Sequence, residues 1–426
     1  MPLEPLARHT TYAHGLPGAA HSARSAPRRA LLALLILVAA GVIGAPVVAQ
    51  TAPGIPAAPL VGPLIAADSA NQTAITLYDV GSQTIRRLAF GAGWHHVWGF
   101  SADGCRLIYT LSDGPALPKL YSARLDGSDP RALVQYDALP AAAWGIWEPQ
   151  ASPAGDRIAF TMIRDNRLRD GTRERTYHVG WVPAAGGVPE FYSVSGDEHT
   201  PRWSPDGAWL AYVAYEERVA GATIFATAEP PPPDSAGSAA PLLREADLWV
   251  VGADGSNKDR LTNFPTGSVQ MPAWSPDGDL IGFVYAPSPS SDQFWMIGNA
   301  AGAIPTQLSF EPTLVLDITW LPDSTALLTA ARHLQNIRAN QLWQIPLVGS
   351  ADTDATLYPL AGEPLSHVDF PRFSADGRWL VVRSAYALAL IDTEVRAWSL
   401  LAEMPLGNTP AVWSPAGFDG EAACPA

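Results

Sequence analysis

The feature that most constrains the fold of this chain is a short turn motif that returns seven times, roughly every 50 residues. Two copies read Trp-Ser-Pro-Asp-Gly, at 203–207 and 274–278. In such a turn, proline presets φ at the second position, serine and aspartate bond the local backbone, and glycine takes the last place. The looser copies lie at 100–104, 151–155, 320–324, 373–377 and 413–417. Self-similarity at this spacing is typical of a repeat protein.

The residues around each copy predict β-strands. Directly after the turn comes an apolar run such as 208–214 or 378–384, which predicts a strand buried on both faces. A second run follows, as at 247–255, and then a shorter one, as at 258–264. Together with the segment before the turn, each repeat has four strands. Four-stranded units repeated around an axis form an all-β propeller.

The two ends of the chain carry complementary parts of one further repeat. The last turn, at 413–417, has no strands after it, whereas residues 63–90 predict three strands with no turn before them. One strand from the C-terminal end and three from the N-terminal end would complete a four-stranded antiparallel blade and leave no open sheet edge. We therefore predict a seven-bladed β-propeller whose closing blade is shared by both ends, with a six-bladed ring as the fallback.

The first 49 residues predict a targeting segment. Three arginines precede an uncharged apolar run at 30–49, a pattern typical of a secretory signal peptide that is cleaved after Ala49. A retained membrane anchor is the alternative, because 20 apolar residues can span a bilayer. Both place the rest of the chain outside the cytoplasm, in the periplasm or secreted. The predicted domains are a signal peptide or anchor at 1–49, a Pro/Ala-rich linker at 50–62 and the propeller at 63–426.

The charge of the chain limits its partners. The formal net charge is −14, and the only lysines are Lys119 and Lys258. An acidic chain with so few lysines is a poor electrostatic match for nucleic acid or anionic lipid. We therefore expect a monomer with no nucleic-acid partner, which contacts a membrane only through a possible anchor at 30–49.

The two cysteines, Cys105 and Cys424, have no spacing that suggests a metal site. Cys105 follows the turn of the first blade, and the chain ends shortly after the turn of the closing blade beside it. The residues between Gly417 and Cys424 can span about 23 Å. In an oxidising compartment a disulfide between Cys105 and Cys424 would hold the ring closed.

The repeat at 63–417 resembles the WD-like propeller repeat of TolB-type proteins, which also occurs in the propeller domains of the prolyl oligopeptidase and tricorn peptidase families. The resemblance implies a propeller that serves as a binding platform, as the gate of a peptidase or occasionally as an enzyme. The chain departs from the peptidases, because it has no Gly-x-Ser-x-Gly motif and no room for a hydrolase domain. It also departs from TolB, which has an α/β domain before its propeller.

We expect a ligand at the mouth of the central channel, on the face opposite the turn motifs, here called the top face. Each repeat has a polar residue four or five places before the turn serine, so that one polar side chain from every blade would surround the mouth. These residues are His96, Glu148, His199, Gln270, Asp317, Asp369 and Thr409. Trp94 and Trp147 stand near them and could stack on a sugar or anchor a peptide. Ordinary solvation of the channel and core packing of the tryptophans are the structural alternatives.

Two functions follow from this predicted mouth, and a purely structural repeat domain in a surface assembly, with freely replaceable mouth residues, is a third alternative. The first is a non-enzymatic extracytoplasmic propeller, with no cofactor, that binds a protein, peptide or glycan partner on its top face. The second rests on a resemblance to oligogalacturonate lyase, a propeller enzyme that holds a metal with histidines and a glutamine, as His96, His199 and Gln270 would. It implies a metal-dependent lyase or hydrolase that acts on an acidic polysaccharide. A stoichiometric divalent ion lost in His199→Ala would favour the enzyme.

Two further segments of the predicted top face are unusual. Residues 163–176 are rich in arginine, and arginine recognises carboxylates, so this segment could receive an acidic partner. A solvated loop balanced by nearby acidic residues is the alternative. Residues 222–241 are a proline-rich insertion, which predicts either disorder or a flap that binds a partner. The arginines of the segment 163–176 are Arg164, Arg167, Arg169, Arg173 and Arg175.

Overall fold

The computed structural model describes a defined set of segments within the 426 residues. These are residues 47–48, 58–114, 116–140, 143–168, 171–192, 196–219, 242–288, 291–332, 334–336, 339–362, 365, 367–385, 387–405 and 409–425. The chain divides into two units, 1–47 and 48–426, and the account below concerns the second. The predicted signal or anchor lies outside the described residues, apart from the two-residue strand β1 (Val47–Val48). Within the described segments, no helix has the length and apolar composition needed to cross a membrane.

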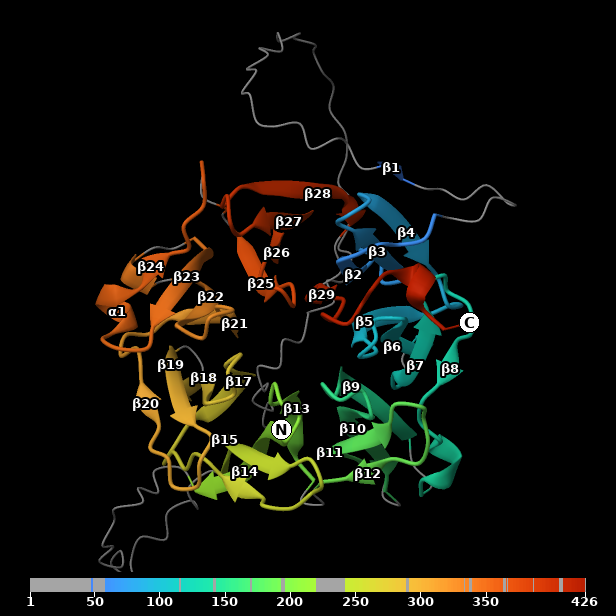
Figure 1. The fold of residues 1–426 in the computed structure, drawn as a ribbon. Coiled ribbons are helices and arrows are strands. Elements are labelled where there is room, and N and C mark those ends of the chain that lie inside the picture. Colours follow the sequence, from blue (N-terminus) through green and yellow to red (C-terminus); the bar gives the residue numbers. More distant parts are fainter. Residues whose placement is uncertain are drawn as a thin grey trace, which may run out of the picture. The chain divides into compact units, whose positions relative to one another are not determined.

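Seven small antiparallel sheets follow one another around a ring (Figure 1). The closing blade contains β29 (Val412–Trp413), β2 (Leu64–Asp68), β3 (Ile75–Asp79) and β4 (Thr84–Leu88). Blade 1 contains β5 (Trp94–Phe100), β6 (Arg106–Ser112), β7 (Lys119–Arg124) and β8 (Arg131–Ala132). Blade 2 contains β9 (Ala143–Ala151), β10 (Arg157–Arg167), β11 (Arg173–Pro183) and β12 (Glu190–Phe191). Blade 3 contains β13 (Glu198–Trp203), β14 (Trp209–Val219), β15 (Leu242–Gly252) and β16 (Asp259–Arg260).

The remaining blades repeat this order. Blade 4 contains β17 (Ser268–Trp274), β18 (Leu280–Ser288), β19 (Ser291–Gly298) and β20 (Thr306–Gln307). Blade 5 contains β21 (Leu314–Trp320), β22 (Ala326–Arg332), β23 (Gln341–Pro346) and β24 (Thr356–Leu357). Blade 6 contains β25 (Val368–Phe373), β26 (Trp379–Ser384), β27 (Ala387–Asp392) and β28 (Trp398–Pro405). The short helices are η1 (Tyr136–Ala138), η2 (Leu334–Asn336), α1 (Ala351–Asp354) and η3 (Glu421–Ala423).

The prediction of seven blades with a shared closing blade is confirmed, and the six-bladed fallback is excluded. Strand β29 pairs with β2 through Ile65↔Trp413 and Ala66↔Val412. The turn of the closing blade is rebuilt from both chain ends, because the Leu64 amide donates to the Ser414 hydroxyl at 3.0 Å. In an unbroken turn, the Trp209 amide donates to the Ser204 hydroxyl in the same way. We call this meeting of the two chain ends the seam.

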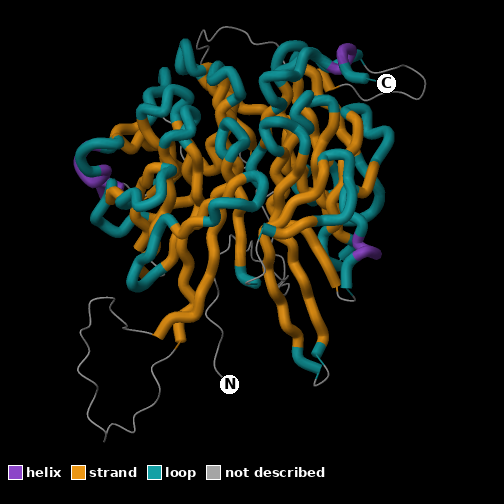
Figure 2. Tube along the Cα trace, turned by 60° about the horizontal axis from the view of Figure 1, so that its bottom comes forward, coloured by secondary structure: helices purple, strands orange, loops and turns teal. Residues whose placement is uncertain are grey.

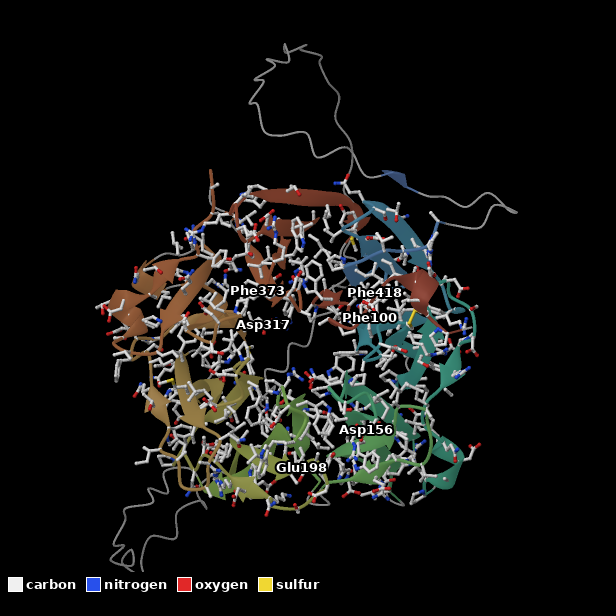
Figure 3. All side chains as sticks on the ribbon, in the orientation of Figure 1. Phe100, Asp156, Glu198, Asp317, Phe373 and Phe418 are labelled. Atoms are coloured by element: carbon white, nitrogen blue, oxygen red, sulfur yellow. A yellow bond between two sulfur atoms is a disulfide. The ribbon has the colours of Figure 1, made fainter. Side chains whose placement is uncertain are left out.

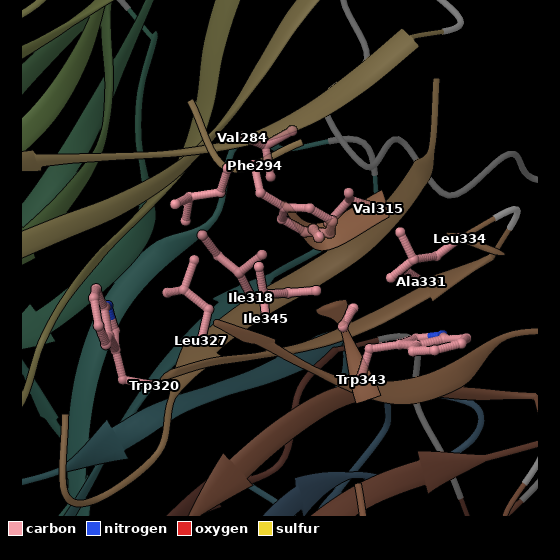
Figure 4. Close-up of a cluster of buried hydrophobic side chains, with 13 residues drawn as sticks. Val284, Phe294, Val315, Ile318, Trp320, Leu327, Ala331, Leu334, Trp343 and Ile345 are labelled. Carbon is pink, nitrogen blue, oxygen red and sulfur yellow. The ribbon is translucent and has the colours of Figure 1, made fainter. Parts of the chain in front are cut away.

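The hydrophobic core lies between neighbouring blades rather than at the centre of the ring. One cluster joins Val284 and Phe294 of blade 4 to Ile318, Leu327 and Trp343 of blade 5 (Figure 4). At the seam, Phe100 of blade 1 and Phe418 of the C-terminal tail belong to one such cluster (Figure 3). Each blade is thus buried by its two neighbours, so a ring is the arrangement that leaves no blade uncovered.

The tryptophan of the turn motif links each blade that has it to the blade before it. Its indole N–H donates to a backbone carbonyl of the preceding inner strand, as from Trp320 to Ala273 at 2.9 Å. The equivalent bonds run from Trp203 to Gln150, from Trp274 to Arg202 and from Trp413 to Arg372. Packing between the blades therefore explains why the motif begins with tryptophan.

We expect Trp320→Phe to destabilise the protein by about 1–3 kcal/mol more than Trp343→Phe. Both tryptophans are almost fully buried, but the indole nitrogen of Trp343 has no hydrogen-bond partner among the described residues. Removing the Trp320 indole leaves the Ala273 carbonyl without its donor, whereas the Trp343 indole N–H has no bond to lose. Urea unfolding of the two variants measures the difference, and equal midpoints would contradict a role for the inter-blade bond.

Candidate functional site

The inner strand of most blades is interrupted close to the predicted mouth residues. Glu148, Thr200, Met271 and Phe370 each have a positive φ near 50° and stand directly before a proline. The register between the first and second strands shifts at each of these places. Because proline has no N–H to donate, the ladder breaks there, and a bulge re-aims the neighbouring side chains. Counting back from the turn serine therefore does not determine which side chain points towards the channel.

His96 and Thr409 of the predicted mouth are brought together by Asp68, which the sequence analysis did not select. The side chain of Asp68 is fully buried. One of its oxygens lies 2.9 Å from His96 Nδ1 and accepts a hydrogen bond from the Thr409 hydroxyl at 2.5 Å. The other accepts from the Val97 amide at 2.7 Å. Asp68 thus joins the N-terminal strand β2 to blade 1 and to the C-terminal segment of the closing blade.

An aromatic group borders His96 on the side of blade 2. The rings of His96, Trp98 and Trp147 contact one another, with centroids 5.2–6.3 Å apart. Trp147 is 37% exposed and Trp94, at the start of β5, is 40% exposed. Trp98 donates to the Thr110 hydroxyl of its own blade. Exposed indole surface beside a polar network is suited to contact with a peptide or a sugar.

Arginines that the sequence analysis did not select face the predicted acidic residues. Arg202 lies 3.8 Å from Glu148, and Arg372, at the matching place in its blade, lies 2.5 Å from Asp317. Asp369 pairs with Arg383. Burial raises the pKa of Asp369 above its usual range, and the negative charge of Asp317 acts in the same direction, against the Arg383 guanidinium. These residues form opposite-charge pairs rather than a ring of free acids.

His199 belongs to a separate polar group above blades 2 and 3. Its Nε2 lies 2.9 Å from Asp197, and its ring contacts Tyr177 at 4.3 Å and Tyr215 at 5.2 Å between centroids. Arg244 donates to the same Asp197 carboxylate. Although burial opposes ionisation, hydrogen bonds from His199 and Arg244 lower the pKa of Asp197 below its usual value.

The residues proposed as metal ligands are held in different blades. His96 of blade 1 is bonded to Asp68, and His199 of blade 3 is bonded to Asp197. Gln270 lies in β17 of blade 4. Over the described segments, no three side chains of His, Cys, Asp or Glu gather closely enough to hold a metal ion.

Two long hairpins, one from blade 2 and one from blade 3, project from the top face, which points downwards in Figure 2. Strands β10, β11, β14 and β15 have 11 residues each, whereas the second and third strands of the other blades have five to nine. The backbone at 196–197 joins the hairpins, because the Tyr177 amide donates to Gly196 and the Tyr215 amide donates to Asp197. Arg169 and the insertion at 222–241 lie outside the described residues.

Among the described residues of the hairpin between β10 and β11, the arginines have different surroundings. Arg175 pairs with Asp165 at 2.8 Å. Arg164 lies over the Trp144 ring at 5.5 Å. Arg167 and Arg173 face each other as the last register pair of the hairpin, and both are exposed. Like charges placed opposite each other repel, so the end of this hairpin is a place where an acidic group would be stabilising.

The chain has partial similarity to proteins of known sequence. No model of a protein family matches it. Over 141 residues it is 31% identical to the uncharacterized protein Atu1656 of Agrobacterium fabrum, which covers 32% of this chain and 45% of that protein. Over 253 residues it is 26% identical to the uncharacterized peptidase YuxL of Bacillus subtilis, which covers 59% of this chain and 31% of that protein. The chain thus spans less than half the length of each of these curated relatives.

Comparison with solved structures finds similar chains at low sequence identity. A puromycin-hydrolyzing peptidase of Mycobacterium tuberculosis has a TM-score of 0.52 and 14% identity, over 78% of this chain and 50% of that chain. Oligogalacturonate lyase in complex with manganese has a TM-score of 0.50 and 15% identity, over 75% and 87%. TolB from Acinetobacter baumannii has a TM-score of 0.43 and 14% identity, over 83% and 67%. At these identities the similarity concerns the fold alone, and the class defined so far is a seven-bladed β-propeller.

Proposed function

We propose that this propeller acts outside the cytoplasm and binds a protein or peptide partner on its top face, without catalysing a reaction. The observation that carries the proposal is the pair of joined hairpins above blades 2 and 3. The other blades complete their sheets with shorter strands, so the extra length does not serve ring closure. It presents side chains beyond the body of the ring, where a partner can reach them.

The composition of the hairpin ends suits a protein segment that carries both acidic and apolar side chains. Arg167 and Arg173 are exposed, and Leu168 between them is 44% exposed. On the neighbouring hairpin, Leu243 is 40% exposed. Arginine, which is enriched at protein interfaces, provides charge recognition, and the exposed leucine beside it adds apolar area that a partner can bury. The join at 196–197 fixes the two hairpins relative to each other, which lowers the entropy lost on binding.

Site-specific photocrosslinking in the producing cells tests the proposal. A benzophenone amino acid at Leu168 is expected to give a discrete crosslinked product in the extracytoplasmic fraction. The same probe at Val348 serves as the matched control, because Val348 is 87% exposed and lies between β23 and β24, on the opposite face. We expect at least ten times less product there.

Charge reversal then shows whether the hairpin itself recognises the partner. Adding Arg167→Glu and Arg173→Glu to the Leu168 probe variant is expected to remove most of the crosslinked product. Equal products from the two faces, or a product that survives charge reversal, would contradict binding through the hairpins. Metal analysis of the same purified protein addresses the alternative of a metal-dependent lyase with His96, His199 and Gln270 as ligands.

A further inference from the structure

A pocket of about 440 Å³ opens on the top face between blades 1 and 2, separate from the residues that surround the channel. Its lining comes from the connection between β6 and β7, from the start of β7, from the region of η1 and from the start of β9. The lining residues are Ala116, Leu117, Lys119, Tyr136, Asp137, Leu139, Pro140, Ala143 and Trp144. Most of them are apolar, and one of the two lysines of the chain is among them.

The walls of the pocket are held in place by hydrogen bonds between the two blades and between each blade and the segment that connects them. The Ile146 amide donates to the Pro118 carbonyl at 2.8 Å, and the Leu120 amide donates to the Tyr136 hydroxyl at 3.2 Å. Gly145 lies so close that a Cβ added there would come within 2.6 Å of the Leu117 side chain. The Trp144 indole donates to the Pro140 carbonyl at 2.9 Å. Since the walls are fixed by these contacts, the pocket is formed before any ligand arrives.

Lys119 brings a positive charge into this apolar space. Its ammonium group donates to the Trp144 carbonyl and lies 3.7 Å from the centroid of the Tyr136 ring. Among the described residues it forms no ion pair, and Asp137, exposed at the rim of the pocket, is not bonded to it. The other lysine, Lys258, does have a carboxylate, Glu198, at 3.7 Å. Burial lowers the pKa of Lys119, as expected for an ammonium that lacks a counter-charge.

We propose that the pocket between blades 1 and 2 binds a carboxylate carried on an apolar body. The carboxylate would lie against the Lys119 ammonium, and the apolar body would lie against Leu117, Leu139 and Trp144. An anion there supplies the negative counter-charge that the Lys119 ammonium lacks, and burial of the apolar body adds to the affinity. Two sources share this chemistry: a free monocarboxylic acid, or the C-terminus of a peptide that ends in an apolar residue. This site does not depend on the hairpin surface of the proposed function.

The scarcity of lysine makes a direct test possible. Reductive methylation with ¹³C-formaldehyde labels only Lys119, Lys258 and the terminal amine, so the NMR signals of the two lysines can be followed separately. We expect 4-phenylbutyrate to shift the Lys119 signal saturably and to leave the Lys258 signal in place. The amide, 4-phenylbutyramide, is expected to bind at least ten times more weakly. The proposal is overturned if no probe shifts the Lys119 signal, or if acid and amide bind alike.

Two variants separate the contribution of the Lys119 charge to binding from the contribution of the cavity. Binding to variants is followed on unlabelled protein by the ¹H saturation transfer of the phenyl group. Lys119→Met removes the charge and keeps the length of the side chain, so affinity should fall at least tenfold. Ala143→Phe fills the pocket and leaves Lys119, and it should also abolish binding. Lys258→Met is the matched control and should bind as the wild type does. Retention of binding in both pocket variants, with unchanged circular dichroism, would place the acid elsewhere and refute the proposal.

A comparison with a peptide ligand identifies the source of the carboxylate. N-acetyl-Leu-Phe with a free carboxylate is compared with its C-terminal amide and with 4-phenylbutyrate. If the peptide acid binds at least ten times more tightly than phenylbutyrate, and its amide does not, the natural ligand is the end of a peptide chain. If phenylbutyrate binds as well as the peptide acid or better, the ligand is a free acid. Either result supports a carboxylate site, and equal binding of peptide acid and peptide amide contradicts it.

Discussion

Replacement of Cys424 by serine is expected to lower the free energy of unfolding by about 3–5 kcal/mol. Cys105 and Cys424 form a disulfide in the structure, and 319 positions separate them in sequence. A crosslink that closes so long a loop removes much of the conformational entropy of the unfolded chain, and the gain grows with the logarithm of loop length. Urea unfolding of wild type and variant, both purified under oxidising conditions, measures the loss.

The same bond can be removed in three further ways, which provide the control. Cys105→Ser, the double serine variant and wild type reduced with a phosphine should all lose as much stability as Cys424→Ser, because each lacks one and the same crosslink. A double variant that loses twice as much as either single variant would mean that the cysteine side chains, not their bond, carry the effect. Unchanged stability after reduction would contradict stabilisation by this crosslink.

The C-terminal tail has further contacts, so loss of the disulfide should not release it. Glu421 receives two hydrogen bonds from the Arg86 guanidinium, at 2.6 and 2.9 Å, and one from the Leu60 amide. Arg124 donates to the carbonyl of Pro425. We therefore expect the cysteine variants to remain folded seven-bladed rings under native conditions, with a lower resistance to urea.

The repeat made the fold predictable because each copy specifies its own local structure. Proline, aspartate and glycine define the turn, and the apolar run after it defines a buried strand, so every copy carried its evidence within about a dozen residues. The incomplete repeats at 63–90 and 413–417 predicted the closing blade for the same reason. The two long hairpins were harder to predict, because the apolar periodicity that marks a strand is lost in arginine-rich residues such as 163–176.

The candidate site was predictable only in part, because its contacts join residues from different repeats. Asp68 ends a buried strand at one end of the chain, and its partners His96 and Thr409 lie 28 and 341 positions away. Nothing local in the sequence connects them. Arg202 and Arg372 did carry a signal, since each follows a proline at the same place in its repeat. Reading that place across the copies would have revealed the arginines beside Glu148 and Asp317, but not Arg383 beside Asp369.

Replacement of Asp68 by alanine is expected to cost about 3–5 kcal/mol, the usual range for removing one partner of a buried polar or ionic group. The change leaves the Val97 amide, the Thr409 hydroxyl and the His96 ring without their common acceptor, at a position where the Asp68 side chain itself is fully buried. Asp68→Asn keeps one oxygen for the Val97 amide, and its NH₂ group can donate to a neutral His96 or to Thr409. We therefore expect Asn to lose clearly less stability than Ala.

An exposed aspartate provides the matched control for Asp68. Asp126 accepts hydrogen bonds from the Ser128 amide and hydroxyl in a turn of blade 1, and it is exposed. Asp126→Ala should therefore cost less than about 1 kcal/mol, since water can replace its bonds. Urea unfolding of both variants is the measurement. An Asp68→Ala protein that unfolds at the wild-type urea concentration would show that this network does not hold the seam.

Combining Asp68→Ala with Cys424→Ser tests whether the Asp68 network and the disulfide stabilise the protein independently. Asp68 stabilises the native state through bonds on the top face, whereas the disulfide acts mainly by restricting the unfolded chain. A change that acts on the native state and one that acts on the unfolded chain should have additive effects on the free energy of unfolding. The double variant should therefore lose about the sum of the two single losses. If it loses only as much as the worse single variant, each change alone already opens the closing blade in the native protein. In that case both bonds stabilise the same native contact, between β2 and β29 of the closing blade.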